Sequence, residues 1–268
     1  MVNDNHMTNT SSTPNTRGRR SGRNSHSDRP RKTAVLVAQR IVSEIADNDL
    51  QPGAPLLSER AMLEHYGVAR GTLRESLRLL ELQGILQIKT GPGGGPFVAE
   101  PASRDLAGVL AMMLQLRRSS FREVLEARHA LEPLLAAQAA ERISDEALAA
   151  LAESVESITA NVADIDLYLE ENENFHSIIA EAAGNQVFFL IISSLAWICD
   201  GTAMGVEFPL KARKVVCEEH RRIYEAIAAR DPKRAADAME HHVMDFERFL
   251  KKKYPAVLNT ILRWDQLD

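Results

Sequence analysis

Three histidines have the residue type and the spacing to bind a divalent metal ion together. His176, His220 and His242 each fall among apolar residues at helical spacing, in three different segments of the chain. Asn172 lies four residues before His176, so the two side chains share a helical face. Imidazole nitrogen and amide oxygen can both bind divalent metals. A single buried histidine is more often a core residue, so core histidines and metal ligands both stay open as interpretations.

A charged residue on an apolar helical face is the second chemical signal. Arg128 shares the predicted helix 121–142 with Val124, Leu125 and Leu131. A buried guanidinium needs an anion, because burial of an unpaired charge is costly. Glu132, one turn further, could supply that anion within the helix. A carboxylate ligand held in a pocket is the alternative.

Residues 56–86 predict two short amphipathic helices joined by a tight turn and followed by a strand. Ser58 can cap the first helix, and the turn is expected at residues 65–67. The second helix would bury Leu73, Leu77 and Leu80. Its arginines then face away from the core, where they suit phosphates and guanine edges. The pattern is typical of a helix-turn-helix, with an ordinary helical hairpin as the alternative.

The flanking segments favour a winged helix-turn-helix of three helices plus a β-hairpin wing. Upstream, apolar residues predict a helix that ends before the turn at 50–53. Downstream, residues 85–88 and 97–99 read as strands around a glycine-rich tip at 91–96. The stripe expected to be buried on the upstream helix consists of Val37, Ala38, Ile41, Val42 and Ile45.

The rest of the chain predicts a mainly α protein. Helical periodicity continues from about residue 103, and its breaks predict an antiparallel bundle of six or seven helices. The expected organisation is a disordered basic tail over 1–33, the winged helix over 34–100, an all-helical domain over 103–252, and a C-terminal extension over 253–268. Residues 102–107 are expected to link the two domains.

Charge is unevenly distributed along the chain. The net charge of -5 divides into +5 over residues 1–33, -2 over 34–100 and -8 over 101–268. This distribution suits a DNA-binding protein that a duplex approaches from one end. Arginines of the tail could add phosphate contacts, or the tail could be inert coil.

The sequence has no signal peptide and no apolar run of roughly 18 residues, and it contains only two cysteines. We therefore expect a cytoplasmic protein without a membrane span.

The motifs L-x-P-G, L-x-S-E-R, G-V-x-R and R-E-x-L-x-x-L follow one another within residues 34–100. In this respect the chain resembles the GntR family of bacterial transcription regulators. Ala69 and Gly71 depart from that family, which usually has Ser or Thr at the first position and a larger residue at the second. The resemblance implies DNA contacts by Arg60, Arg70, Gly71, Thr72 and Arg74, and close approach of the wing glycines Gly93, Gly94 and Gly95 to the minor groove.

The segment from Asn172 to Asn185, the pair Glu219-His220 and the segment 239–242 resemble the FCD effector domain of the FadR subfamily. That resemblance implies an all-helical bundle holding a divalent metal near a ligand cavity. The ligands implied here are Asn172, His176, His220 and His242, and His241 would be solvated. Metal-binding members usually have Asp at the first of these positions. The amide is a weaker ligand, so we expect a Zn or Ni type ion to be held loosely and completed by water or an effector carboxylate.

The function expected is a dimeric, ligand-responsive transcription regulator, a repressor by resemblance. As a homodimer it would read a short inverted repeat in a double-stranded DNA operator, and a small carboxylate metabolite would bind in the bundle with Arg128 as a candidate anchor. One alternative is a metal sensor, in which the ion is the signal. A metal-dependent hydrolase is disfavoured because no general base is evident and the winged helix would have no role.

Overall fold

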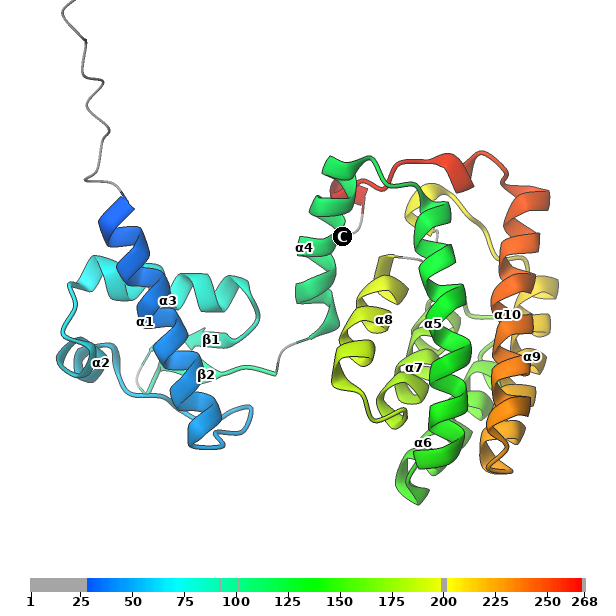
Figure 1. Cartoon of the computed structure of the whole chain (residues 1–268), viewed down its shortest axis with the longest axis horizontal. Helices are drawn as coiled ribbons and strands as arrows, with labels where there is room; N and C mark the ends of the chain where they lie inside the picture. Colours follow the sequence, from blue (N-terminus) through cyan, green and yellow to red (C-terminus); the bar gives the residue numbers. More distant parts are fainter. Residues whose placement is uncertain (1–27, 92, 101, 199–201, 267–268) are drawn as a thin grey trace, which may run out of the picture.

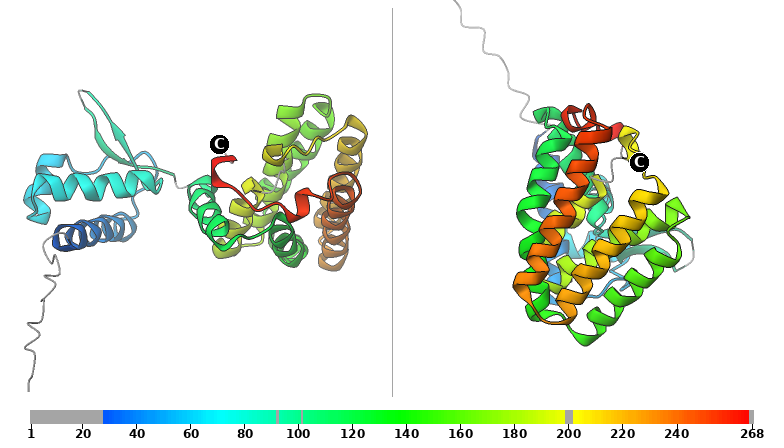
Figure 2. Two further views of the ribbon diagram at one scale, coloured as in Figure 1. Left: turned by 90° about the horizontal axis from the view of Figure 1, so that it is seen from above. Right: turned by 90° about the vertical axis from the view of Figure 1, so that its right-hand side faces the viewer.

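The computed structural model describes residues 28–266 except 92, 101 and 199–201. Two lobes lie side by side, with α1 to α3 and the β-hairpin in one and α4 to α10 in the other (Figure 1). A second view shows them joined by the single stretch of chain that leads into α4 (Figure 2). The predicted tail arginines before residue 28 lie outside the described residues. Among the described residues, no helix is both long enough and apolar enough to span a membrane.

The N-terminal lobe is the predicted winged helix-turn-helix. α1 begins at Asp28, six residues before the expected domain start, and buries Ala34 in place of Val42, which is 40% exposed. The lobe's core is formed by Met62, Tyr66 and the stripe predicted for the second helix of the motif. Its elements are α1 (Asp28–Asp47), α2 (Glu59–Tyr66), α3 (Arg70–Leu82), β1 (Leu86–Lys89) and β2 (Gly95–Val98).

The helix ends around the turn follow from local capping. Ser58 caps α2 by accepting a hydrogen bond from the amide of Ala61 at 3.3 Å. The helix runs to Tyr66, so the turn comes slightly later than predicted and is centred on Gly67, whose φ of 63° is left-handed. Ala69 stands at the N-cap of α3 and makes no side-chain cap.

The wing is an antiparallel hairpin that pairs Leu86 with Val98 and Lys89 with Gly95. At its tip the backbone folds back closely, so that a side chain at Gly94 would overlap the carbonyl of Lys89. The amide of Gly94 donates to the carbonyl of Gly91 at 2.9 Å. Glycine is therefore required at this point of the tip for steric reasons.

In the described part of the C-terminal lobe there are seven α-helices, in agreement with the predicted six or seven. Ser144, Asp164 and Asp231 cap α6, α7 and α10, at the predicted breaks. The expected linker over 102–107 is wrong, because α4 already begins at Ser103. The helices are α4 (Ser103–Arg117), α5 (Phe121–Arg142), α6 (Asp145–Ala160), α7 (Ile165–Ala182), α8 (Gln186–Ile198), α9 (Leu210–Ala228) and α10 (Pro232–Lys253).

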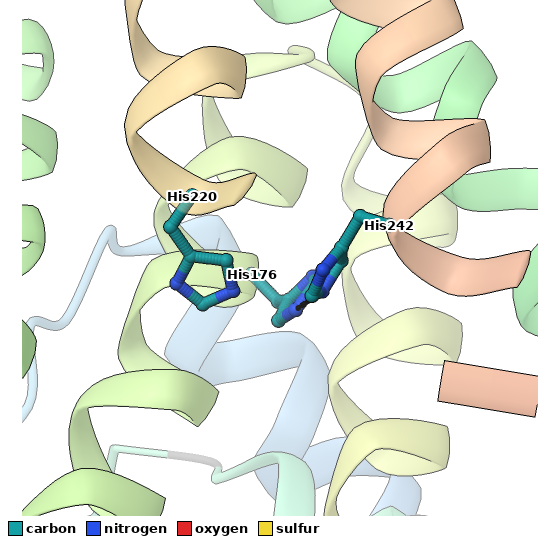
Figure 3. Close-up of side chains that lie close together, drawn as sticks. All are labelled: His176, His220 and His242. Carbon is teal, nitrogen blue, oxygen red and sulfur yellow. Dashed lines mark hydrogen bonds between the residues drawn. The ribbon is translucent and has the colours of Figure 1, made fainter. Parts of the chain in front are cut away.

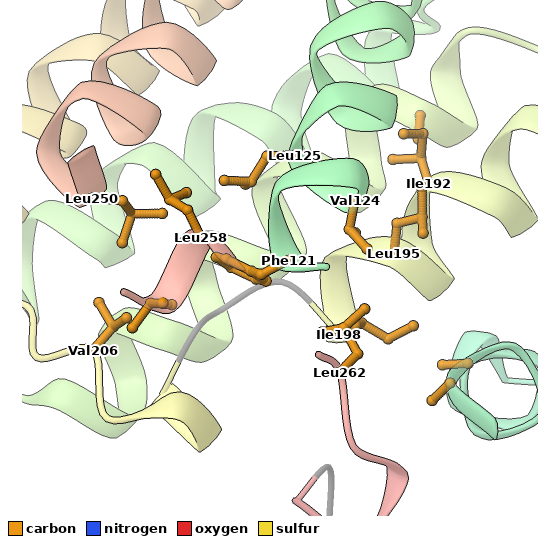
Figure 4. Close-up of a cluster of buried hydrophobic side chains, with 14 of the residues drawn as sticks. Phe121, Val124, Leu125, Ile192, Leu195, Ile198, Val206, Leu250, Leu258 and Leu262 are labelled. Carbon is orange, nitrogen blue, oxygen red and sulfur yellow. The ribbon is translucent and has the colours of Figure 1, made fainter. Parts of the chain in front are cut away.

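The segment after α10 belongs to the core of the bundle. Leu258 and Leu262 are 1% exposed and lie with Phe121 at the centre of the cluster in Figure 4. The amide of Leu262 donates to the carbonyl of Ser119 at 3.2 Å. The predicted C-terminal extension therefore completes the helical domain.

Candidate metal centre and nucleic-acid interface

Three helices bring the three predicted histidines together. His176 lies on α7, His220 on α9 and His242 on α10, and their side chains converge in the interior of the bundle (Figure 3). Their exposed fractions are 4%, 0% and 6%, and one ligand atom from each lies within 4.8 Å of the other two. The convergence inferred from helical spacing is confirmed.

Two carboxylates fix the orientation of two of the rings. Nδ1 of His176 lies 2.7 Å from Oε2 of Glu132, and Nδ1 of His242 lies 2.9 Å from Oε2 of Glu219. An ionised carboxylate only accepts hydrogen bonds, so His242 donates to Glu219 through Nδ1, whereas Nδ1 of His176 contacts Glu132 without hydrogen-bond geometry. The two Nε2 atoms face each other at 3.3 Å. At that distance the two nitrogens share a proton in a hydrogen bond or, if both carry lone pairs, repel each other unless a cation lies beside both of them.

The third ring has unpaired nitrogens. His220 stacks on Phe175, with ring centroids 3.8 Å apart and planes 9° from parallel. Its Nδ1 and Nε2 are both buried without a hydrogen-bond partner among the described residues. Burial lowers the pKa of His220 well below its usual value, so the ring is neutral. A neutral imidazole with buried, unpaired nitrogens is costly unless something binds it.

These donors fit a divalent metal ion. Three converging imidazoles, each with a ring nitrogen that no carboxylate contacts, form a nitrogen ligand set that suits Zn²⁺ or Ni²⁺. Carboxylates behind His176 and His242 are the usual outer partners of metal-binding histidines. Asn172, the fourth predicted ligand, is half-buried one turn before His176 on α7.

Glu132 is also the ion-pair partner of Arg128. Arg128 is 8% exposed, and its Nε contacts Oε1 of Glu132, so the pairing within the helix is confirmed. Burial raises the pKa of Glu132, but Arg128 and His176 outweigh it and lower the pKa below its usual value. Glu132 is thus an ionised bridge between the guanidinium and the imidazole. The role of Arg128 as an effector anchor stays a prediction.

Sequence reasoning missed Glu219. It is 5% exposed and contacts two histidines of α10, because its Oε1 also lies 3.5 Å from Nδ1 of His241. The side chain of His241 is 55% exposed, as expected of a residue at the bundle surface. The sequence shows Glu219 as an acidic residue directly before His220. Its histidine partners belong to α10, so the contact could not be predicted from the sequence around Glu219.

The predicted DNA-contacting residues lie on the surface of the N-terminal lobe. Arg70, Gly71 and Arg74 are exposed at the beginning of α3, and Thr72 is half-buried. Arg74 lies 3.5 Å from Glu59, in a pair that is accessible to solvent.

Two further residues complete this surface. Arg60 is exposed on the first turn of α2 and pairs with Glu64 at 3.7 Å. Lys89, which sequence reasoning did not single out, is exposed at the end of β1 next to the wing tip, 4.2 Å above the ring of Phe97. The wing glycines Gly93 and Gly94 are exposed and Gly95 is half-buried.

Comparisons with known proteins agree with both halves of this architecture. The family model described as bacterial regulatory proteins, gntR family, matches residues 33–95, and that described as FCD domain matches residues 123–245. An uncharacterized HTH-type transcriptional regulator of Bacillus subtilis, YcbG, is 34% identical over 83% of this chain and 91% of its own length. The HTH-type transcriptional repressor NanR of Salmonella newport is 27% identical over 80% of this chain and 83% of its own. A solved structure of Streptococcus agalactiae GntR superposes with a TM-score of 0.61 at 26% identity, over 80% of this chain and 99% of that one.

Proposed function

Since the chain belongs to the GntR family of bacterial transcription regulators and carries an FCD domain, we propose that it is a cytoplasmic repressor whose DNA binding responds to a small carboxylate metabolite. The effector would bind in the helical domain beside a divalent metal ion. The observation that carries this proposal is the buried cluster in which His176 and His242 face each other and the ring nitrogens of His220 have no hydrogen-bond partner among the described residues. The relatives are transcriptional regulators, so the hydrolase alternative has no support.

DNA binding would use the exposed beginning of α3. Arg70 and Arg74 would contact bases and phosphates in the major groove, while Arg60 and the wing contact the flanking backbone. The wing would approach the minor groove through the backbone of its glycines, with Lys89 as the nearest cation. Two copies would read the two halves of an inverted repeat.

The homodimer would form through α4 and α8. These neighbouring helices expose large apolar side chains to solvent, which a monomer of this size seldom does over a continuous surface. Met113 is 60% exposed and Leu116 is 86% exposed. The other members of the surface are Leu106, Val109, Met112, Val187, Leu190 and Ile191. A Leu116→Glu variant should shift the protein to monomer in light scattering and weaken operator binding.

The metal, of the Zn or Ni type, would be held by His176, His220 and His242 with Asn172 as a weak fourth ligand. When bound, it supplies a positive centre that attracts a carboxylate. Asn172 removes no charge from that centre, so metal affinity is lower and attraction for an anion higher than with an aspartate. Arg128 would contribute a second cation on the same side of the bundle.

Regulation requires that the effector bind one arrangement of the dimer better than another. The short connection into α4 would transmit the difference between the two dimer arrangements to the DNA-binding domains. A rotation of α4 would change the spacing between the two recognition helices, which are the α3 helices of the two subunits. NanR is named as a repressor, which supports the same sign here.

The test is an operator-binding assay with the full-length protein and the DNA upstream of its own gene. Metal content is measured by mass spectrometry, and operator affinity is measured with carboxylates and with a chelator. His220→Ala should lose the metal and the response to carboxylates, whereas the control His129→Ala, a half-buried histidine of α5, should keep both. Unchanged metal content and response in His220→Ala would contradict the proposal. Operator affinity that follows metal alone, at constant carboxylate, would instead identify a metal sensor.

A further inference from the structure

One half-buried arginine of the helical domain forms no ion pair with any acid that the structure describes. Arg213 lies in α9, and its Nε and one terminal nitrogen are buried without a hydrogen bond to any described residue. Its guanidinium lies 5.8 Å from the centroid of the Tyr168 ring, near the outer limit for a cation–π contact. Tyr168 is 2% exposed, so this contact lies in the interior. Two guanidinium nitrogens buried without a hydrogen bond are costly, and an anion could accept from both of them.

Arg213 lies on the same side of α9 as the histidine centre. Arg213, Cys217 and His220 are spaced by four and three residues and therefore share one helical face. Across from them, Tyr168 precedes His176 by two turns of α7. Tyr168 faces Arg213, and Phe175 stacks on His220, so the two helices run alongside each other from the arginine to the histidines.

The spacing sets the size of the missing ligand. Seven residues of helix separate Arg213 from His220, which is about 10 Å along the axis. A metal–oxygen contact takes up roughly 2 Å of this and a guanidinium–carboxylate contact roughly 3 Å. The remaining span of about 5 Å suits two acid groups on a backbone of about four to six carbons.

We propose that Arg213 binds a second anionic group of the effector, so that the ligand is a small diacid or an acid carrying another anion at its far end. One acid group would lie at the histidine centre and the other at Arg213, beside Tyr168. This inference rests on the proposed function, because it assumes that a carboxylate binds at the metal. Arg128 is paired with Glu132, which also contacts His176, so Arg128 lies at the histidine end of the site. Arg213 would bind the acid group at the other end of the ligand.

Calorimetric titration of the full-length, Zn²⁺-loaded protein tests this proposal. The probes are succinate, glutarate and adipate, each compared with the monoacid of equal length. We expect the best diacid to bind at least tenfold more tightly than its monoacid. Arg213→Gln should abolish that preference and leave the monoacid affinity within twofold. Arg222→Gln, an exposed arginine of the same helix, is the matched control and should keep the preference.

The protein without metal or ligand provides a second measurement. Arg213→Gln and Arg213→Met remove two guanidinium nitrogens that are buried without a hydrogen bond, so each should raise the melting temperature of the unliganded protein by a few degrees. A preference for diacids that survives in both variants, or that the wild type lacks, would overturn the role of Arg213. If neither diacids nor monoacids bind to the metal-loaded wild type, the proposed function itself fails. That result differs from one in which monoacids bind but diacids are not preferred, which contradicts only the role of Arg213.

Discussion

Gly84, in the turn that ends α3, lies directly against the carboxylate of Asp105 in the first turn of α4. The glycine has a left-handed φ of 67°, and any side chain there would overlap the carboxylate. Asp105 is held in place by the amide of Ala102, which donates to its Oδ2 at 3.0 Å. The turn that follows α3 in the DNA-binding domain is therefore tightly packed against the first helix of the effector domain.

Gly84→Ala should destabilise this contact by about 2 kcal/mol, because the left-handed backbone costs roughly 1 kcal/mol and the overlap adds to it. Asp105→Ala alone should cost about 1 kcal/mol through the lost hydrogen bond to Ala102. The double variant should cost less than the sum, since the second substitution removes the overlap. Urea unfolding of all four proteins measures the coupling. Strictly additive values would show that the two residues do not interact.

Glu219→Gln should weaken Zn²⁺ binding by about 10- to 100-fold, because the carboxylate behind His242 fixes the ring and makes its Nε2 more basic. Competition with a chromogenic chelator measures the affinity. Glu218→Gln, at the exposed neighbouring position, is the control and should bind Zn²⁺ like the wild type. Equal affinities for both variants would show that Glu219 has no part in the metal centre.

Asn172→Asp should raise Zn²⁺ affinity at least tenfold, since a carboxylate is a stronger ligand than an amide and neutralises part of the ion's charge. The same change should weaken the binding of added carboxylates. Asn174→Asp introduces the same charge at an exposed position of α7 and controls for its long-range effect. If both variants raise the affinity equally, residue 172 is not a ligand.

Ala69→Ser should stabilise the DNA-binding domain by about 1 kcal/mol. Ala69 has φ -71° and ψ 152°, a conformation in which a serine hydroxyl can accept from the first turn of α3. Thermal unfolding measures the gain. Ala46→Ser, at an exposed position inside α1, should instead destabilise the domain by roughly 0.5 kcal/mol, because serine favours a helix interior less than alanine does. A gain at both positions would argue against capping.

Glu44→Gln should reduce stability at neutral pH and lose this effect in acid. Burial raises the pKa of Glu44, but hydrogen bonds from Tyr66 at 2.6 Å and from His65 outweigh it and lower the pKa below its ordinary value of 4.5. The contribution is therefore fully present above pH 4.5 and disappears as the pH falls through the lowered value. Urea unfolding of both proteins between pH 3 and pH 7 gives the difference, with Glu75→Gln as the exposed control. A difference that grows toward acid pH would contradict the depressed pKa.

Local patterns were sufficient for most of the fold. Ser58, Ser144 and Asp231 mark helix starts by side chain alone, because a cap acts within three residues of its own position. Val42 was wrongly predicted to be buried. Several apolar residues of α1 lie near the buried face, and the position of α3 decides which of them are covered. The core role of the segment after α10 could not be read from its short apolar runs.

The identities of the three histidines were evident in the sequence, and so was the pairing of Arg128 with Glu132, because each follows from helical spacing. The contacts that the three histidine rings make were decided by tertiary packing. His176 and His242 meet across 66 residues of chain, and Glu219 orients a ring that belongs to another helix. The lack of an anion at Arg213 is likewise a property of its surroundings. Periodicity specifies which side of a helix is buried, whereas ring orientation and unmet hydrogen bonds arise only when several helices pack together and exclude water.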